Sequence, residues 1–185
     1  MALIPPEGLK RGFAGLMNAY NGQRVGAGTV ALGIAAGAYE LALDFSRERP
    51  QFGRPICEFQ GLQWMLADMH TQIEAARLLL HKAASVNLEN SGDGNVFPDI
   101  LEAAQAKIFA SEMAIKVTND ALQIFGSSGY SRNYPLERMA RDARMFTIGG
   151  GTAQILRTVV ASALLGRKFP QTRDGYSKQE KNYSD

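Results

Sequence analysis

The spacing of apolar residues predicts that this chain is built from helices. Apolar positions recur every three or four residues through most of the sequence, and no segment alternates apolar and polar residues as a half-buried strand does. The second of these segments runs from Arg24 to about Arg49 without a proline. The predicted helices span residues 7–20, 24–49, 59–89, 98–125, 136–142 and 152–165.

Short polar, glycine-rich or proline-containing stretches separate these segments. The Asn21-Gly22 pair is expected to end the first helix, residues 50–55 form a loop, and Gly126 is the expected stop of the helix that precedes it. Long helices joined by short connectors predict an all-α, up-and-down four-helix bundle. We expect this bundle to occupy residues 1–166 and a polar tail to follow over 167–185.

Composition excludes several classes of function. With 45% hydrophobic and 21% charged residues, the chain has the makeup of a globular domain. Its 20 basic and 18 acidic residues are interspersed, which gives nucleic-acid binding no support. Cys57 is the only cysteine, and the start of the sequence lacks the pattern of a secretory signal, so we expect a cytoplasmic protein, or a mitochondrial matrix protein if the source is eukaryotic.

No metal site is predicted. Helical di-iron proteins need Glu-x-x-His pairs, and none occurs in this sequence. His70 and His81 lie on one predicted helix, and a rise of 1.5 Å per residue separates them by about 16 Å. Two ligands of one metal ion must lie much closer together.

The second predicted helix contains two motifs that we set aside. Gly33 and Gly37 form a G-x-x-x-G pair of the kind found in membrane helices, but Glu40 and Asp44 favour a soluble helix with close neighbours, and no membrane partner is expected. Residues 25–28 hint at a dinucleotide-binding loop. No strand precedes them and no third glycine follows at the required spacing.

Three consecutive glycines, residues 149–151, lie directly before Thr152, which opens the last helix. The backbone N–H groups at such a helix N-terminus can hold an anionic ligand. The alternative is that the glycines only allow a sharp turn between two helices.

Several motifs follow one another along the chain. They are RPQFGRPICEFQ at 49–60, DALQIFG at 120–126, PLER at 135–138, RDA at 141–143 and Gly-Thr at 151–152. Together they resemble the C-terminal helical domain of the acyl-CoA dehydrogenase family, over residues 7–165. The resemblance implies an FAD-dependent flavoprotein of fatty acid metabolism, an oxidoreductase that works as a homodimer or homotetramer on an acyl-CoA. It also implies that the family's N-terminal and middle domains lie outside this sequence.

The resemblance further implies a cofactor site shared between subunits. Arg49 would hold the pyrophosphate of a neighbouring subunit's FAD, and Phe52 would pack near its adenine. The implied cofactor-binding residues are Arg49, Phe52, Gln60, Gln123, Ile124, Phe125, Gly126, Ser127, Thr152 and Gln154. The implied substrate-binding residues are Asn21, Arg24 and Gly151, with Asn21 standing where an acidic residue is common in the family.

One element of the family pattern is missing. Most members carry a catalytic glutamate directly before the Gly-Thr pair, and this position is Gly150 here. Some branches place the glutamate before the arginine of the first long helix, and that position is Gln23. Neither residue can accept the α-proton that the family's chemistry removes.

Three explanations remain for the missing base. The base comes from the other domains, the chemistry needs no C–H deprotonation, or catalysis has been lost. The leading hypothesis is the C-terminal domain of a flavoprotein that oxidises the α,β-bond of an acyl-CoA thioester with FAD. The alternatives are a base-lacking offshoot of the family, such as an acyl-CoA desulfinase, and a non-catalytic helical scaffold for self-association.

Overall fold

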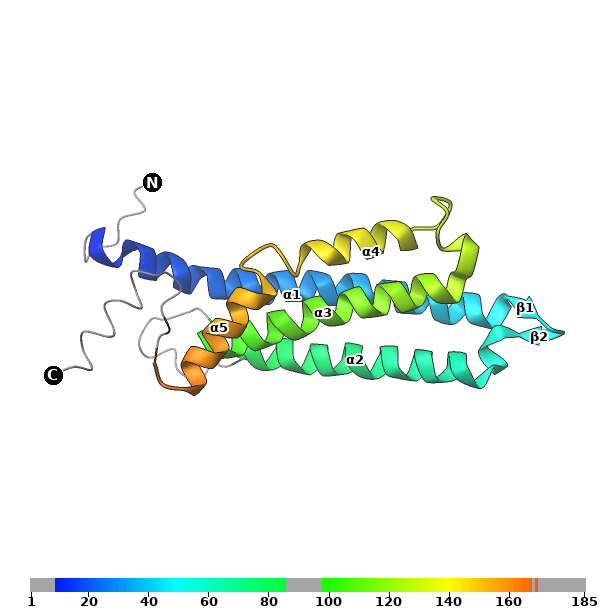
Figure 1. Ribbon diagram of the computed structural model, residues 1–185, viewed down its shortest axis with the longest axis horizontal. Helices are drawn as coiled ribbons and strands as arrows, with labels where there is room; N and C mark the ends of the chain where they lie inside the picture. The colour runs from blue at the N-terminus through cyan, green and yellow to red at the C-terminus, as the bar shows by residue number, and fades with distance from the viewer. Residues whose placement is uncertain (1–8, 86–97, 168, 170–185) are drawn as a thin grey trace.

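The computed structural model is an all-α domain, as predicted. It describes residues 9–85, 98–167 and 169, except for the side chains of residues 9–15, 17 and 18. Its helices are α1 (Leu9–Glu48), α2 (Gln60–Ser85), α3 (Ile100–Phe125), α4 (Leu136–Met145) and α5 (Ala153–Leu164). The first three run lengthwise, α4 lies along them, and the short α5 crosses them at a steep angle (Figure 1). Residues 86–97, which include the predicted connector, and nearly all of the predicted tail lie outside the described part.

The core is formed where α1 packs against α2 and α3. Ala31, Ala35, Ala38 and Ala42 recur at helical spacing on α1 and are fully buried. Their small side chains let neighbouring backbones approach closely. By length and hydropathy α1 also meets the criterion for a membrane span over Ala19–Glu48, which core helices of soluble proteins also meet. The buried alanine face packs α1 into the core of this domain.

The predicted break at Asn21-Gly22 is wrong, because α1 continues through both residues. Asn21 is only 3% exposed, and its side-chain Oδ1 accepts a hydrogen bond of 2.8 Å from Arg24 Nη1, one turn further along. The amide oxygen is therefore satisfied inside the helix and does not compete for the local backbone, which is how asparagine usually ends helices.

The boundaries of α3 follow the sequence signals closely. Asp99 is the N-cap, and its carboxylate accepts hydrogen bonds from the N–H groups of Leu101 and Glu102. Pro98 therefore lies just before the cap and not within the first turn. At the other end, Gly126 adopts a φ of 58° and ends the helix, as predicted.

The loop between α1 and α2 contains a small hairpin that the sequence did not predict. Strands β1 (Pro50–Gln51) and β2 (Arg54–Pro55) pair antiparallel. Phe52 and Gly53 between them both have positive φ values, 52° and 79°, which is the conformation of a two-residue type I′ turn. The hairpin lies at one extremity of the elongated molecule (Figure 1).

Candidate functional site

The residues predicted to bind ligands form two groups. The hairpin group lies at the end of the molecule that carries β1 and β2, where α3 also ends, and the glycine-loop group lies where α5 begins (Figure 1). The hairpin group consists of Arg49, Phe52, Gln60 and 123–127. The glycine-loop group consists of Asn21, Arg24, Gly151, Thr152 and Gln154.

Helix α3 connects the two groups and sets their separation. Lys107 of α3 donates a hydrogen bond from Nζ to the carbonyl oxygen of Gly151 at 2.7 Å, and Phe125 is the last residue of the same helix. A rise of 1.5 Å per residue places these two α3 positions about 27 Å apart. One chain therefore does not bring the two groups together into one compact pocket.

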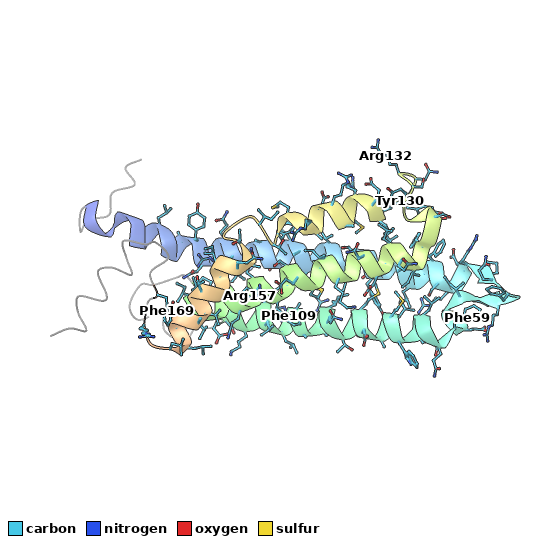
Figure 2. The ribbon with its side chains drawn as sticks, in the orientation of Figure 1. Phe59, Phe109, Tyr130, Arg132, Arg157 and Phe169 are labelled. Carbon is cyan, nitrogen blue, oxygen red and sulfur yellow. The ribbon has the colours of Figure 1, made fainter. Side chains whose placement is uncertain are left out.

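Within the hairpin group, the residues of the α1–α2 loop present their side chains to the outside. Phe52 is 92% exposed although its backbone adopts the left-handed conformation, which costs a non-glycine residue roughly 1–2 kcal/mol. Its ring and that of Phe59 form an edge-to-face pair with centroids 6.2 Å apart, and the Arg54 guanidinium lies 4.3 Å from the centroid of the Phe59 ring. Phe59 lies at the hairpin end of the molecule (Figure 2). Arg49 is exposed and has no ion pair within the described residues. An exposed ring and a free cation suit a ligand that combines aromatic and anionic parts.

The end of α3 divides into core and surface residues. Ile124 and Phe125 are 6% and 5% exposed, and Phe125 stacks on Phe45 with ring centroids 4.0 Å apart. Their side chains therefore belong to the core, so any contact with a ligand must come from their backbone. Gln123 and Ser127 are exposed and free to contact a ligand.

The N-terminus of α5 offers fewer free donors than the sequence suggested. Thr152 is the N-cap, and its Oγ1 accepts from the Ile155 N–H at 3.2 Å. The Ala153 N–H donates to the Thr147 carbonyl oxygen at 2.9 Å. Only the Gln154 N–H in this first turn has no acceptor among the described residues. The helix end is thus largely self-satisfied and is not an anion site by itself.

The glycine loop takes a conformation that favours glycine. Gly150 and Gly151 have φ values of 70° and 94°. A Cβ at Gly150 would meet no atom within 4 Å, so the space beside it is open in this domain. In a family member with a glutamate at this position, the side chain would extend into that space. In this chain the position is glycine, so no carboxylate occupies the space.

Two buried cations lie beside this loop. Arg24 on α1 is 7% exposed and Lys107 on α3 is fully buried. The helices are close here, because a Cβ at Gly28 would lie 3.6 Å from the Lys107 Cα. Burial and the charge of Arg24 lower the pKa of Lys107, and burial lowers the pKa of Arg24. Neither cation forms an ion pair with any carboxylate in the described part of the chain.

Lys107 was not among the residues predicted from the sequence. A signal was available, because this lysine stands in an alanine-rich stretch of α3 whose alanines prove to be buried. A long cation in such a stretch must either extend to solvent or find an acceptor in the core. The buried alanines around it are Ala103, Ala104, Ala106 and Ala110.

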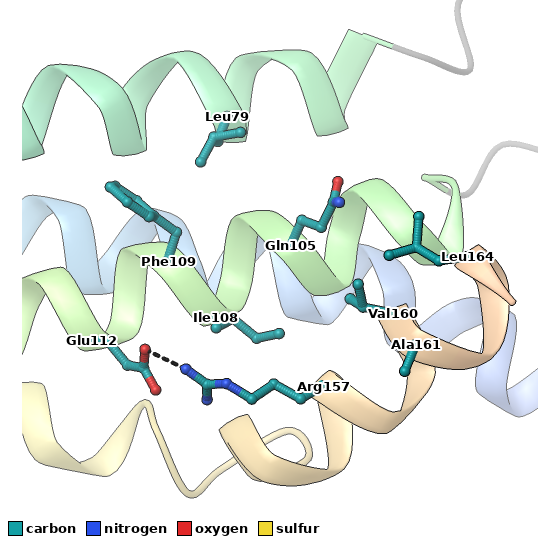
Figure 3. A pocket seen from close by; sticks show the side chains of 9 residues that line it. All are labelled: Leu79, Gln105, Ile108, Phe109, Glu112, Arg157, Val160, Ala161 and Leu164. Carbon is teal, nitrogen blue, oxygen red and sulfur yellow. Dashed lines mark hydrogen bonds and ion pairs between the residues drawn. The ribbon is translucent and has the colours of Figure 1, made fainter. Parts of the chain in front are cut away.

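A carboxylate near the start of α5 is held in an ion pair. Glu112 of α3 accepts from Arg157 Nη2 at 2.7 Å (Figure 3), and this hydrogen bond lowers the pKa of Glu112. On one side Glu112 borders a cavity of about 230 Å³ that Thr152 and Gln154 also line. On the other it borders a larger, mainly apolar groove of about 580 Å³ between α2, α3 and α5 (Figure 3).

Comparison with known proteins identifies the domain. The model of the acyl-CoA dehydrogenase C-terminal domain matches residues 10–165, which is most of the chain. The chain belongs to the acyl-CoA dehydrogenase family. The resemblance stated from the motifs is thereby confirmed, and the fold agrees with it. The structure of butyryl-CoA dehydrogenase from Megasphaera elsdenii superposes with a TM-score of 0.76 and 44% identity, over 84% of this chain and 39% of that one.

Within the family, the chain is similar to desulfinases. It is 68% identical to 3-sulfinopropanoyl-CoA desulfinase of Cupriavidus necator over 95% of this chain and 43% of that protein. The identity to the protein of the same name from Advenella mimigardefordensis is 65%, over 98% of this chain and 44% of that protein. The chain thus spans less than half the length of these relatives.

Proposed function

We propose that the whole protein containing this domain removes the sulfinate group from a short 3-sulfinoacyl-CoA. The observation that carries the proposal is the absence of a carboxylate at both family base positions. Gly150 offers open space in place of a side chain, and Gln23 carries an amide. An acyl-CoA dehydrogenase needs a base for the α-proton, whereas desulfination does not. Higher identity to desulfinases than to butyryl-CoA dehydrogenase supports the same choice.

The proposed reaction balances without an oxidant. The bond between Cβ and sulfur breaks, Cβ gains a proton, and the sulfur gains a hydroxyl group from water. A 3-sulfinoacyl-CoA and water thus give the saturated acyl-CoA and hydrogen sulfite. Because no electrons leave the substrate, the reaction requires no electron acceptor.

Glu112 is a poor substitute for the missing base. It is the carboxylate among the residues that line the cavity beside Thr152, but its hydrogen bond to Arg157 lowers its pKa. A lowered pKa weakens its ability to accept a proton from carbon. The interior of this domain therefore supports chemistry without α-proton abstraction.

The residues present fit FAD, with one part of the site coming from each of two chains. Arg49, free of any described carboxylate, would hold the pyrophosphate, and the exposed Phe52 ring would pack on the adenine. Thr152 and Gln154 would bind the cofactor of their own subunit through a hydroxyl and amides. When bound, FAD would supply a redox-active flavin, which in dehydrogenating family members accepts the β-hydride. We expect a cytoplasmic homodimer or homotetramer.

Purified full-length protein tests the proposal. Incubation with 3-sulfinopropanoyl-CoA should release sulfite and saturated acyl-CoA, while the flavin absorbance stays unchanged. Incubation with butyryl-CoA should leave the flavin oxidised. Flavin bleaching by butyryl-CoA with formation of the enoyl product would instead establish a dehydrogenase. Protein that stays colourless with added FAD and converts neither thioester would establish the non-catalytic scaffold.

A further inference from the structure

Lys107 is an unfavourable residue for the core of this domain. It is fully buried on α3, and the one hydrogen bond that it forms with the described residues joins Nζ to the carbonyl oxygen of Gly151 at 2.7 Å. A hydrogen bond from a charged donor is stronger than a neutral one, but removing an ammonium group from water costs more than one such bond contributes. Stability alone would therefore favour an apolar side chain of similar length at this position.

The glycine loop has little else to hold it. Gly150 and Gly151 both adopt positive φ values, and glycine loses more conformational freedom on ordering than any other residue. The bond from the Ala153 N–H to the Thr147 carbonyl oxygen closes only the base of the loop. Among the described residues, the bond from Lys107 is the only hydrogen bond that Gly150 or Gly151 forms. Lys107 therefore ties the least restrained part of the loop to a long helix.

The same bond orients the peptide that leads into α5. The C=O and N–H groups of a trans peptide point in opposite directions. Because the Gly151 carbonyl is directed at Lys107, the N–H of Thr152 points away from it. This N–H and that of Gln154 have no acceptor among the described residues, and both residues line the cavity of about 230 Å³. Lys107 thus sets the direction of a free donor at a residue proposed to bind the cofactor.

We propose that Lys107 is a positioning residue for FAD, which holds the glycine loop and the start of α5 in their binding conformation before the cofactor enters. This inference rests on the cofactor site of the proposed function. A loop that is ordered in advance lowers the entropy cost of binding. Lys107 does not contact the cofactor itself, because its side chain is fully buried and its ammonium is directed at Gly151.

FAD titration of the full-length apoprotein tests the positioning role without turnover. Lys107→Met keeps the length of the side chain but removes the donor and the charge. We expect the Kd of FAD to rise about tenfold, while the midpoint of urea unfolding at neutral pH stays the same or rises. Ser111→Ala is the matched control, because it also removes a buried hydrogen bond of α3, which the Ser111 hydroxyl donates to the Ile108 carbonyl oxygen within the helix. The control should bind FAD like wild type.

A second substitution tests whether Lys107 acts through the loop. Gly149 does not have a positive φ, and a Cβ there would lie 3.0 Å from the sulfur of Met145, whose exposed side chain can move. Gly149→Ala should therefore fit, and it should reduce the number of conformations open to a loop that Lys107 no longer holds. Added to Lys107→Met, it should recover part of the lost FAD affinity.

The outcomes separate this inference from the function. Unchanged FAD affinity in Lys107→Met would overturn the positioning role, and so would a fall in its urea midpoint, which would identify a structural residue. No recovery of affinity by Gly149→Ala would also overturn it, because Lys107 would then act by another route than the loop. Wild-type protein that binds FAD but releases no sulfite from 3-sulfinopropanoyl-CoA would refute desulfination and leave the positioning role in place.

Discussion

Asn21 shows how one residue can be misinterpreted from sequence and still matter for the site. Next to a glycine it resembles a helix stop, but a buried acceptor for Arg24 outweighs its weak helix propensity. The sequence could not reveal this, because the acceptor role depends on α1 being packed on both neighbours. The family's usual acidic residue at this position would neutralise Arg24, whereas the amide orients it and leaves its charge available.

Two substitutions of Asn21 should separate orientation from charge. Asn21→Leu leaves a buried Nη1 donor without an acceptor, so we expect a loss of about 1–3 kcal/mol in the free energy of unfolding. Asn21→Asp keeps an acceptor and adds a counter-charge, so the free energy of unfolding should be maintained. Denaturant unfolding of the full-length protein measures both effects. A loss of stability in the aspartate variant as large as in the leucine variant would contradict the acceptor role of this side chain.

The buried ammonium of Lys107 predicts a particular dependence of stability on pH. Burial and Arg24 lower its folded-state pKa below the ordinary 10.5. Between the two pKa values the unfolded chain binds more protons than the folded one, so the free energy of unfolding contributed by Lys107 rises with pH. Wild-type protein should therefore gain stability relative to Lys107→Met as pH increases toward 10.5. A difference between the two proteins that stays constant or shrinks with pH in denaturant titrations would contradict this account.

At the scale of elements, the helix boundaries were predicted correctly where one residue sets the end of the helix. The stop at Gly126 and the start of α5 at Thr152 were predicted within a residue, because each depends on one residue with a special conformation or a capping side chain. The hairpin at 50–55 was not predicted, because strands of two residues are too short to show alternation. Its turn also places Phe52 where glycine or asparagine is usual.

Phe52 in that turn is expected to serve binding at the expense of stability. Phe52→Gly removes both the left-handed strain and the exposed ring, so the free energy of unfolding should stay the same or rise by up to about 1 kcal/mol. Retention of FAD by full-length protein should fall, as measured by flavin absorbance after gel filtration. Phe52→Tyr keeps the ring and the strain, and should retain FAD like wild type. Full FAD retention by the glycine variant would exclude this ring from the cofactor site.

At the scale of the whole molecule, the described part of the domain exposes several large apolar residues. Trp64, Leu78 and Leu164 are 63%, 68% and 70% exposed. Large exposed apolar side chains mark surfaces for other domains or subunits. The sequence motifs identify the family and include residues of both the hairpin group and the glycine-loop group. The separation of the two groups, about 27 Å along α3, follows only from the fold. The structure shows that the two groups lie apart, and under our proposal each FAD site takes one group from each of two chains.

Mixed oligomers test that requirement. One variant, Arg49→Ala/Phe52→Gly, damages the hairpin group, and the other, Thr152→Ala/Gln154→Ala, damages the glycine-loop group. Each alone should lose FAD. If every site takes one group from each of two chains, a mixed dimer has one intact site of two, so the purified mixed species should hold about half of the wild-type FAD content. Co-expression with two affinity tags and flavin quantification of the mixed species measures this. A mixed dimer without FAD would mean that both groups of a site lie in one chain, because each chain then carries one damaged group.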